Sequence, residues 1–195
     1  MVDYFEELVK NLNNTNHTFE IVSSEIVKYN ESHSFDLFDF GVSDEVRYIY
    51  NNYKMFNLVW KNREIKMSGF VNFIPYESVL KEYQEMYTAV HKIEDSLIEN
   101  QDIVINDIIN WYPLFGFPNG DAFCYDRRNG KIVFYEHEVF DNGINLHGLL
   151  IAESIHDLYE KWSKVLFVDV YDWFEGVNER GIDMSKSVYK GVIHE

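Results

Sequence analysis

The sequence contains few of the residues that mark disulfide-rich, linker-rich or membrane-spanning proteins. One cysteine, Cys124, is present among 195 residues, which excludes an intrachain disulfide. Three prolines and ten glycines are few for a chain with long linkers, which favours one domain. No apolar run approaches the ~18 residues of a bilayer-spanning helix. Asp3, Glu6 and Glu7 stand where a secretory signal carries basic residues, so we expect a cytoplasmic protein that does not enter a membrane.

Basic residues are also scarce. The chain has 17 Lys and Arg against 33 Asp and Glu, which gives a net charge of −16. A charge of this sign repels phosphate backbones, so we expect no direct binding to nucleic acid. Two interpretations of the charge remain, namely solubility of an acidic protein and attraction to a basic partner. Charge alone favours solubility.

Hydrophobic residues make up 46% of the chain and aromatic residues 17%, which is enough for a substantial core. Helical and strand patterns do not alternate as regular β–α–β units. We therefore expect an α+β fold with a central, mainly antiparallel sheet flanked by helices. Residues 1–195 are treated as one domain, with a core over about 42–165, a helical N-terminal extension and a C-terminal tail after Gly181.

Helices are expected where apolar residues recur at helical spacing, over residues 1–12, 44–53, 77–99 and 155–165. Ser43 and Ser154 are suitable N-cap residues for the second and the fourth of these helices. The third helix is the longest, and one of its faces is apolar while the other is charged. We expect it to bury the apolar residues Leu80, Tyr83, Tyr87, Val90 and Leu97.

Strands are expected over residues 56–60, 69–74, 103–110, 121–125 and 131–137, with a turn at 61–62. The β-branched run over 103–110 gives the strongest strand signal, whereas residues 18–29 fit a helix or a strand. Asn129 and Gly130 supply the positive φ angles of a tight turn, so the last two strands should form a hairpin. Both faces of this hairpin are partly apolar, which places it in the middle of the sheet.

No nucleophile motif, phosphate-binding loop or dinucleotide fingerprint occurs in the chain. Cys124 lies between aromatic residues in a strand, which is typical of a buried structural thiol. Asp121 could act as a general acid or base, but an aspartate at such a turn usually accepts hydrogen bonds from nearby amides. We therefore assign no catalytic residue and no cofactor.

A metal site was considered where Glu136, His137 and Glu138 are followed by Asp141 and His147. In a strand, Glu136 and Glu138 point to one face and His137 to the other, so the three do not converge on one ion. We expect a solvated strand end with no bound metal.

The chain resembles the SUKH superfamily, which includes fungal cell-wall assembly regulators and bacterial immunity proteins. Three blocks carry the resemblance: a helix and a strand ending in Trp over residues 42–60, a strand stopped by Pro75, and residues 111–165. The last block contains Gly120-Asp121, the turn at Gly130, a strand ending in an acidic-His pair and a closing helix. The resemblance covers about residues 42–165. It implies an α+β fold and non-enzymatic protein binding.

Taken together, the charge and the resemblance lead us to expect a cytoplasmic immunity protein that binds a basic toxin domain, such as a nuclease, and blocks its substrate cleft. A second hypothesis is an intracellular regulatory or scaffold protein of the cell-wall regulator type. A third is a metal-dependent enzyme that uses His137 and nearby acids. The oligomeric state is left open.

Two groups of residues are candidates for the partner-binding surface. The first 50 residues hold ten acids against three bases, and the segment 35–40 mixes acids with aromatic residues that suit an interface unless the first helix covers them. The other group surrounds the predicted hairpin, where ordinary solvated turns are the alternative. The candidates are Asp36, Phe38, Asp39, Phe40, Asp121, Asp126, Glu136, Glu138 and Asp141.

Overall fold

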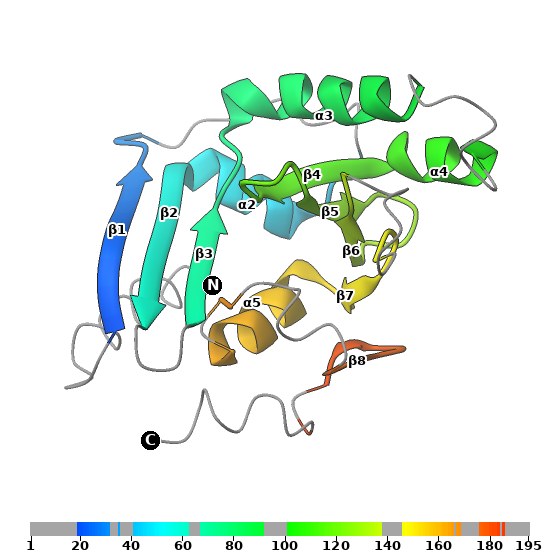
Figure 1. Cartoon of the computed structure of the whole chain (residues 1–195). Coiled ribbons are helices and arrows are strands. Elements are labelled where there is room, and N and C mark those ends of the chain that lie inside the picture. The colour runs from blue at the N-terminus through cyan, green and yellow to red at the C-terminus, as the bar shows by residue number, and fades with distance from the viewer. Residues whose placement is uncertain are drawn as a thin grey trace.

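The computed structural model describes residues 19–31, 35, 41–62, 67–91, 101–137, 146–165, 167–168, 176–183 and 185. Helices and strands follow one another along the chain as shown in Figure 1. In order they are β1 (Phe19–Lys28), α2 (Asp44–Asn52), β2 (Tyr53–Asn62), β3 (Met67–Asn72), α3 (Tyr76–His91), α4 (Gln101–Ile108), β4 (Trp111–Gly116), β5 (Ala122–Asp126), β6 (Ile132–Tyr135), β7 (Leu150–Ala152), α5 (Ile155–Lys164), β8 (Val177–Asn178) and β9 (Gly181–Ile182).

The α+β class and the antiparallel pairing are confirmed, but the strands form two sheets instead of one central sheet. One sheet has the order β1-β2-β3 and the other the order β4-β5-β6-β7-β9-β8. The sheets meet where the chain leaves β3. Phe73 forms a bridge with Phe115, and the Ile74 amide donates to the Leu114 carbonyl at 3.0 Å. Side chains from both sheets then contribute to the same hydrophobic core.

The predicted hairpin is confirmed as β5 and β6, and both strands lie inside the larger sheet. Gly130 has a φ of +77° at the turn, a conformation that glycine adopts without strain. The two faces of the hairpin belong to different cores. Phe123 and Phe134 face the core that contains α5, whereas Cys124 and Tyr135 face a second core beneath α3 and α4.

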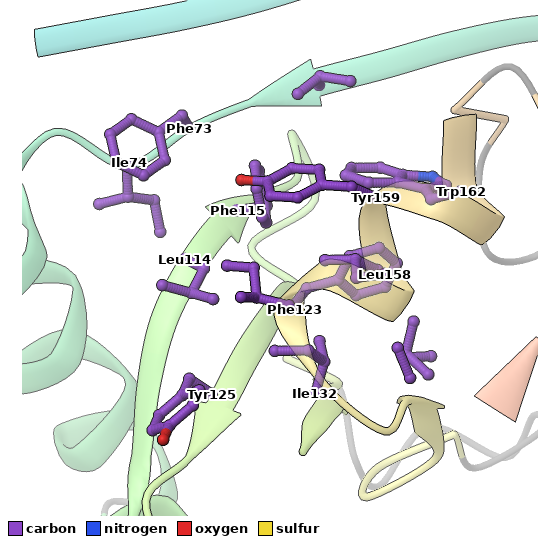
Figure 2. Packing of buried hydrophobic residues seen from close by; sticks show 14 of the residues in the cluster. Phe73, Ile74, Leu114, Phe115, Phe123, Tyr125, Ile132, Leu158, Tyr159 and Trp162 are labelled. Carbon is purple, nitrogen blue, oxygen red and sulfur yellow. The ribbon is translucent and has the colours of Figure 1, made fainter. Parts of the chain in front are cut away.

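Both predicted serine caps are confirmed. Ser43 Oγ accepts from the Val46 amide at 3.4 Å, and Ser154 Oγ accepts from the Asp157 amide at 3.1 Å. Helix α5 buries the four residues expected on its inner face, which are Ile155, Leu158, Tyr159 and Trp162. Trp162 lies against Phe115 and Phe123, with ring centroids 5.4 and 4.9 Å apart, as the close-up of this core shows (Figure 2).

The prediction of a strand over residues 103–110 was wrong, because residues 101–108 form helix α4. As a helix, the run turns Ile105 and Ile108 toward the second core, where Ile108 is fully buried. The same geometry places Asp107 on the outer side, within reach of Arg128. A short apolar run fits both periodicities, and packing against α3 and β4 decides between them.

The expected inner face of the long helix was wrong at Leu80 and Tyr87, while Tyr83 is half-buried and the side chain of Val90 lies outside the described residues. In α3 the buried side chains are Val79 and Met86, while Leu80 is 58% exposed and Tyr87 is 38% exposed. The hydrogen bond from Ile74 to Leu114 ties the start of the helix to β4 and so sets its rotation. The helix ends at His91, and Leu97 lies outside the described residues.

Three smaller expectations also changed. Residues 18–29 are resolved as a strand, since β1 pairs with β2 over almost its whole length. Lys61 and Asn62 belong to β2 instead of forming a turn. Gly181 and Ile182 form β9, which pairs with both β7 and β8, so the segment after Gly181 is not all tail. The helix predicted over residues 1–12 lies outside the described residues.

Candidate protein-interaction surface

Three of the five hairpin candidates are buried. Asp121 is 3% exposed, Asp126 is 2% exposed and Glu136 is 6% exposed. A carboxylate at this depth is retained only when donors inside the protein replace water. The prediction that these three acids present charge to a partner is therefore corrected, because each one is used within the fold. Glu138 and Asp141 lie outside the described residues.

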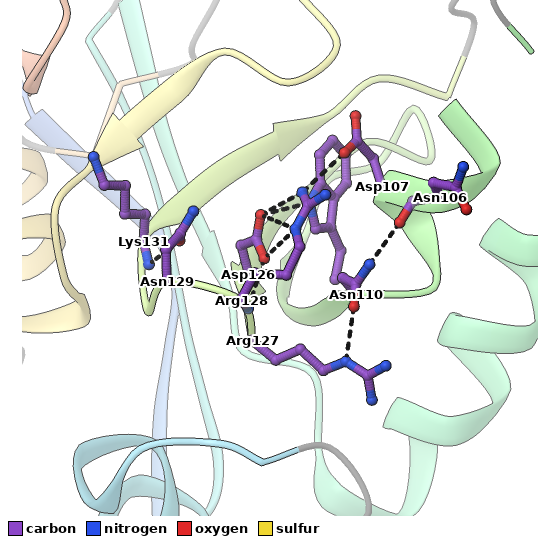
Figure 3. Close-up of polar contacts among 9 residues, drawn as sticks. Asn106, Asp107, Asn110, Asp126, Arg127, Arg128, Asn129 and Lys131 are labelled. Atoms are coloured by element: carbon purple, nitrogen blue, oxygen red, sulfur yellow. Dashed lines mark hydrogen bonds and ion pairs between the residues drawn. The ribbon is translucent and has the colours of Figure 1, made fainter. Parts of the chain in front are cut away.

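Asp126 is held by the turn that follows it. Its carboxylate accepts from the Arg128 amide at 2.9 Å and from Arg128 Nη2 at 2.6 Å, and it also accepts from the Trp111 indole at 3.3 Å. Arg128 Nη2 also contacts Asp107 Oδ1 at 2.8 Å, which ties α4 to the turn (Figure 3). Burial alone would raise the pKa of Asp126, but the hydrogen bonds and charge of Arg128 hold it below its usual value. The aspartate therefore stays ionised and organises the turn.

Asp121 and Glu136 each accept a backbone hydrogen bond that joins the chain near the end of β6 to another segment. Asp121 Oδ2 accepts from the Asn119 side-chain amide of its own turn, and Asp121 Oδ1 accepts from the His137 backbone amide at 2.7 Å, just beyond the end of β6. Glu136 Oε2 accepts from the Leu146 amide at 2.9 Å and so joins the end of β6 to the chain that leads into β7. Burial raises the pKa of Glu136, while this hydrogen bond partly opposes the shift.

Of the residues that could bind a metal or act in catalysis, the structure describes Asp121, Cys124, Glu136, His137 and His147. Strand β6 ends at Tyr135, before both residues, and Glu136 is buried while His137 is exposed. Among the described residues, no group of three or more histidine, cysteine or carboxylate side chains is placed to hold a metal ion. Cys124 is fully buried, and burial raises the pKa of its thiol well above the usual value. This thiol suits packing and not nucleophilic attack.

His147 is a core residue whose role the sequence did not indicate. Its ring lies on Trp111 with centroids 4.8 Å apart and meets Tyr135 edge-on at 5.9 Å. Burial lowers the pKa of His147 to about 4, although the negative charge of Asp107 partly offsets this effect. The imidazole is therefore neutral at physiological pH and packs as an aromatic ring.

The N-terminal candidates Asp36, Phe38, Asp39 and Phe40 lie outside the described residues. Their neighbour Phe35 is described and is half-buried. Its ring stacks on Tyr76 with centroids 4.0 Å apart and lies 5.5 Å from the ring of Tyr29. Its amide donates to Asn51 Oδ1 at 3.2 Å. Phe35 thus connects the acidic segment to the folded body at a defined point.

Two exposed glutamates are close in sequence to the residues of this aromatic contact. Burial raises the pKa of Tyr29, and the negative charge of Glu77 raises it further. Glu31 follows Tyr29 by two residues and is exposed. We call Tyr29, Glu31, Phe35, Tyr76 and Glu77 the acidic corner. The sequence shows the aromatic residue Phe35 within an acidic stretch. It does not show the contact of Phe35 with Tyr76, because the two residues lie about 40 positions apart in the chain.

Elsewhere, many surface acids are neutralised by neighbouring lysines. Lys131 pairs with Glu153 at 3.1 Å, and along α5 Lys161 pairs with Asp157 and Lys164 with Glu160, both at 2.8 Å. By contrast, the stretch from residue 29 to residue 45 contains five acids and no Lys or Arg. This stretch includes Tyr29, Glu31 and Phe35 of the acidic corner and runs into the first turn of α2. The charged residues of this stretch are therefore all negative.

A scan against protein-family models, a search of curated proteins and a search of solved structures each return no match to this chain. None of the helices in the described part of the chain combines the length and the hydrophobicity needed to cross a bilayer.

Proposed function

We propose that this chain is a protein-binding module, an immunity protein that neutralises a cognate toxin domain by occupying a basic surface of that toxin. The observation that carries the proposal is the acidic corner. It combines aromatic side chains fixed by the fold with carboxylates that face solvent, which is a composition suited to a protein interface. The resemblance to the SUKH superfamily over residues 42–165 supports the same proposal and supplies the toxin as the class of partner.

The mechanism would be steric and electrostatic. Negative charge around the corner attracts a basic cleft such as that of a nuclease, and the bound module excludes the nucleic acid. Attraction of this kind raises association rates by about 10- to 10³-fold and weakens as salt is added. Phe35 and Tyr76 would supply the apolar contact at the centre, and Glu31 and Glu77 the charged rim. Asp36, Phe38, Asp39 and Phe40, which adjoin Phe35 in the sequence, remain candidates for the same interface.

The test begins by identifying the genes beside this one and uses any toxin-like domain that they encode. We expect the purified chain to bind that domain and abolish its activity, with an association rate that falls as sodium chloride is raised. The double substitution Glu31→Gln and Glu77→Gln should slow association several-fold and flatten the salt dependence.

The matched control is Glu179→Gln, which removes the charge of an exposed acid in the turn between β8 and β9. It should leave the association rate almost unchanged. A neighbouring toxin domain that is neither bound nor inhibited would overturn the proposal. Equal effects of the control and the double variant would show that the corner is not the interface. Capture of a regulatory protein in the absence of any toxin neighbour would favour the regulator hypothesis instead.

A further inference from the structure

Helix α2 carries one aromatic side chain that the fold leaves half uncovered. The inner face of the helix is buried in the core, whereas Tyr48 is 49% exposed. Asp44 lies four residues before Tyr48 and Asn52 four residues after it, so the three side chains share one side of the helix. We call Asp44, Tyr48 and Asn52 the α2 stripe. A tyrosine ring that stands partly in water is a residue type that protein interfaces often bury.

Negative charge beside Tyr48 is open to a partner. Asp44 and Glu45 lie in the first turn of α2, one turn before the tyrosine, and Asp44 is exposed. Within the described part of the chain, neither carboxylate takes part in an ion pair. The nearest basic residue in the sequence is Arg47, whose Nε donates to the Val42 carbonyl at 3.3 Å. Both acids suit the N-terminal end of the helix dipole, and this local role leaves the Asp44 carboxylate in reach of a cation.

The α2 stripe joins the acidic corner at the end of the helix. The Asn52 side-chain amide donates to the Tyr48 carbonyl at 2.7 Å, and the Asn52 carbonyl accepts from the Tyr29 amide at 3.0 Å. The neighbouring Asn51 accepts through Oδ1 from the Phe35 amide at 3.2 Å. Tyr48 thus lies about one helical turn from the points where two residues of the corner attach to α2. The stripe and the corner border each other, and both combine aromatic rings with carboxylates.

From this arrangement we infer that the α2 stripe extends the proposed interface and binds an arginine side chain of the basic partner. The guanidinium stacks on the Tyr48 ring and pairs with the Asp44 carboxylate. Side chains four apart on a helix have Cβ atoms about 5–6 Å apart, so one guanidinium can contact both. Arginine is favoured over lysine, because its planar group stacks on aromatic rings and donates two parallel hydrogen bonds to a carboxylate. The inference rests on the proposed function, since it names the group of the partner that this part of the surface recognises.

Peptide titrations of the full chain test the stripe without a toxin. The probes are hexa-arginine and hexalysine, which carry equal charge, and calorimetry at low salt measures both dissociation constants. The wild type should bind hexa-arginine about two- to fivefold more tightly than hexalysine, as expected for one exposed cation–π contact. Tyr48→Ala should remove this preference, whereas Tyr48→Phe keeps the ring and should retain it. Both changes are at a half-exposed helical position and should leave the circular dichroism spectrum native.

The matched control is Tyr87→Ala. Tyr87 is also an exposed tyrosine on a helix, but Tyr83 and not an acid lies four residues before it. Its removal should leave the preference for arginine unchanged. A wild type that does not distinguish the two peptides would overturn the inference. A preference that survives Tyr48→Ala, or that Tyr87→Ala abolishes to the same extent, would overturn it as well.

Any toxin-like domain found beside this gene gives a second readout. Tyr48→Ala should raise its dissociation rate by about tenfold, because loss of an anchoring ring acts mainly on dissociation. A domain that Tyr48→Ala binds as tightly as the wild type does would overturn the role of the stripe and leave the acidic corner in place. A domain that the wild type does not bind would overturn the proposed function instead, and the peptide ratio would still decide whether the stripe recognises arginine.

Discussion

The β5–β6 hairpin and the acidic corner use the same kinds of residue in opposite ways. At the hairpin, the buried carboxylate of Asp126 accepts hydrogen bonds from Arg128 and Trp111. Arg128 also contacts Asp107, so the charge of Asp126 helps to hold the turn against α4. At the corner, the charge of Glu77 helps to raise the pKa of Tyr29, but Glu77 remains exposed. The difference lies in the supply of donors. At the hairpin, Arg128 and the Trp111 indole supply donors that replace water around the Asp126 carboxylate, whereas the exposed carboxylate of Glu77 keeps its contact with water.

The same two regions differ in whether their acids should stabilise the fold or bind a partner. Removal of a hairpin acid should destabilise the fold, because it leaves buried donors without an acceptor. Removal of a corner acid should barely change the free energy of unfolding and should act on association instead. The following substitutions test that separation.

The largest effect is expected for Asp126→Asn. This substitution removes the charge that compensates the guanidinium of Arg128 and weakens the hydrogen bond from Trp111. Breaking such a pair costs about 2–4 kcal/mol, toward the lower end here because Arg128 is itself 43% exposed. Urea unfolding would measure the loss. Glu153→Gln, which breaks the surface pair with Lys131, is the control and should shift the midpoint little. Equal shifts for the two variants would contradict the structural role of Asp126.

A pH-dependent effect is expected at His147. Its pKa is about 4 in the fold and about 6.5 in an unfolded chain, so between these values the unfolded state binds the extra proton. The contribution of neutral His147 is therefore complete above about pH 6.5, and up to about 3 kcal/mol is lost as the pH falls toward 4.

The raised pKa of Glu136 acts with the opposite sign, because the folded state then favours the protonated carboxyl. It adds stability at low pH that is lost as the pH rises through that pKa. His147→Phe keeps the aromatic packing and removes the titration, so its stability should fall less on acidification than that of the wild type. Thermal unfolding from neutral to acidic pH gives the comparison, with the exposed His156→Gln as control. An unchanged pH profile in His147→Phe would show that this ring does not titrate as described.

The smallest effect on stability is expected at the corner. Phe35→Ala removes a half-buried ring that stacks on Tyr76, which costs about 1 kcal/mol of unfolding free energy. Binding of the toxin domain should fall by at least about tenfold, because the ring is the proposed centre of the contact. Phe35→Leu keeps most of the apolar area and should bind at an intermediate level. Full binding by Phe35→Ala, measured by calorimetry with a correctly folded variant, would remove Phe35 from the interface.

The sequence predicted correctly those features that depend on interactions between residues close together in the chain. Ser43 and Ser154 are N-caps because a hydroxyl beside the first free amides is a short-range interaction. The Asn129-Gly130 turn and the two flanking strands follow from the φ angles that these residues allow. The inner face of α5 was correct because one stripe of that helix is strongly apolar and the opposite side is charged.

Long-range packing decided the features that were predicted wrongly. The run over 103–110 is β-branched, yet it forms a helix because Ile105 and Ile108 then reach the second core together. Helix α3 has two apolar stripes, and its attachment through Ile74 selects the one that contains Val79 and Met86. The buried acids are those that find a hydrogen-bond donor. Arg128, Leu146 and His137 supply these donors, and two of the three lie at least ten residues from the acid that they bind.

The sequence by itself therefore determined the acidity, the α+β class, the helix caps, the central hairpin and the buried thiol. Each of these depends on composition or on residues a few positions apart. The tertiary structure alone decided that there are two sheets, that the hairpin acids are buried, and that Phe35 stacks on Tyr76 beside Glu77. These features depend on contacts between distant segments, and such contacts are fixed when the chain packs and not by any local pattern.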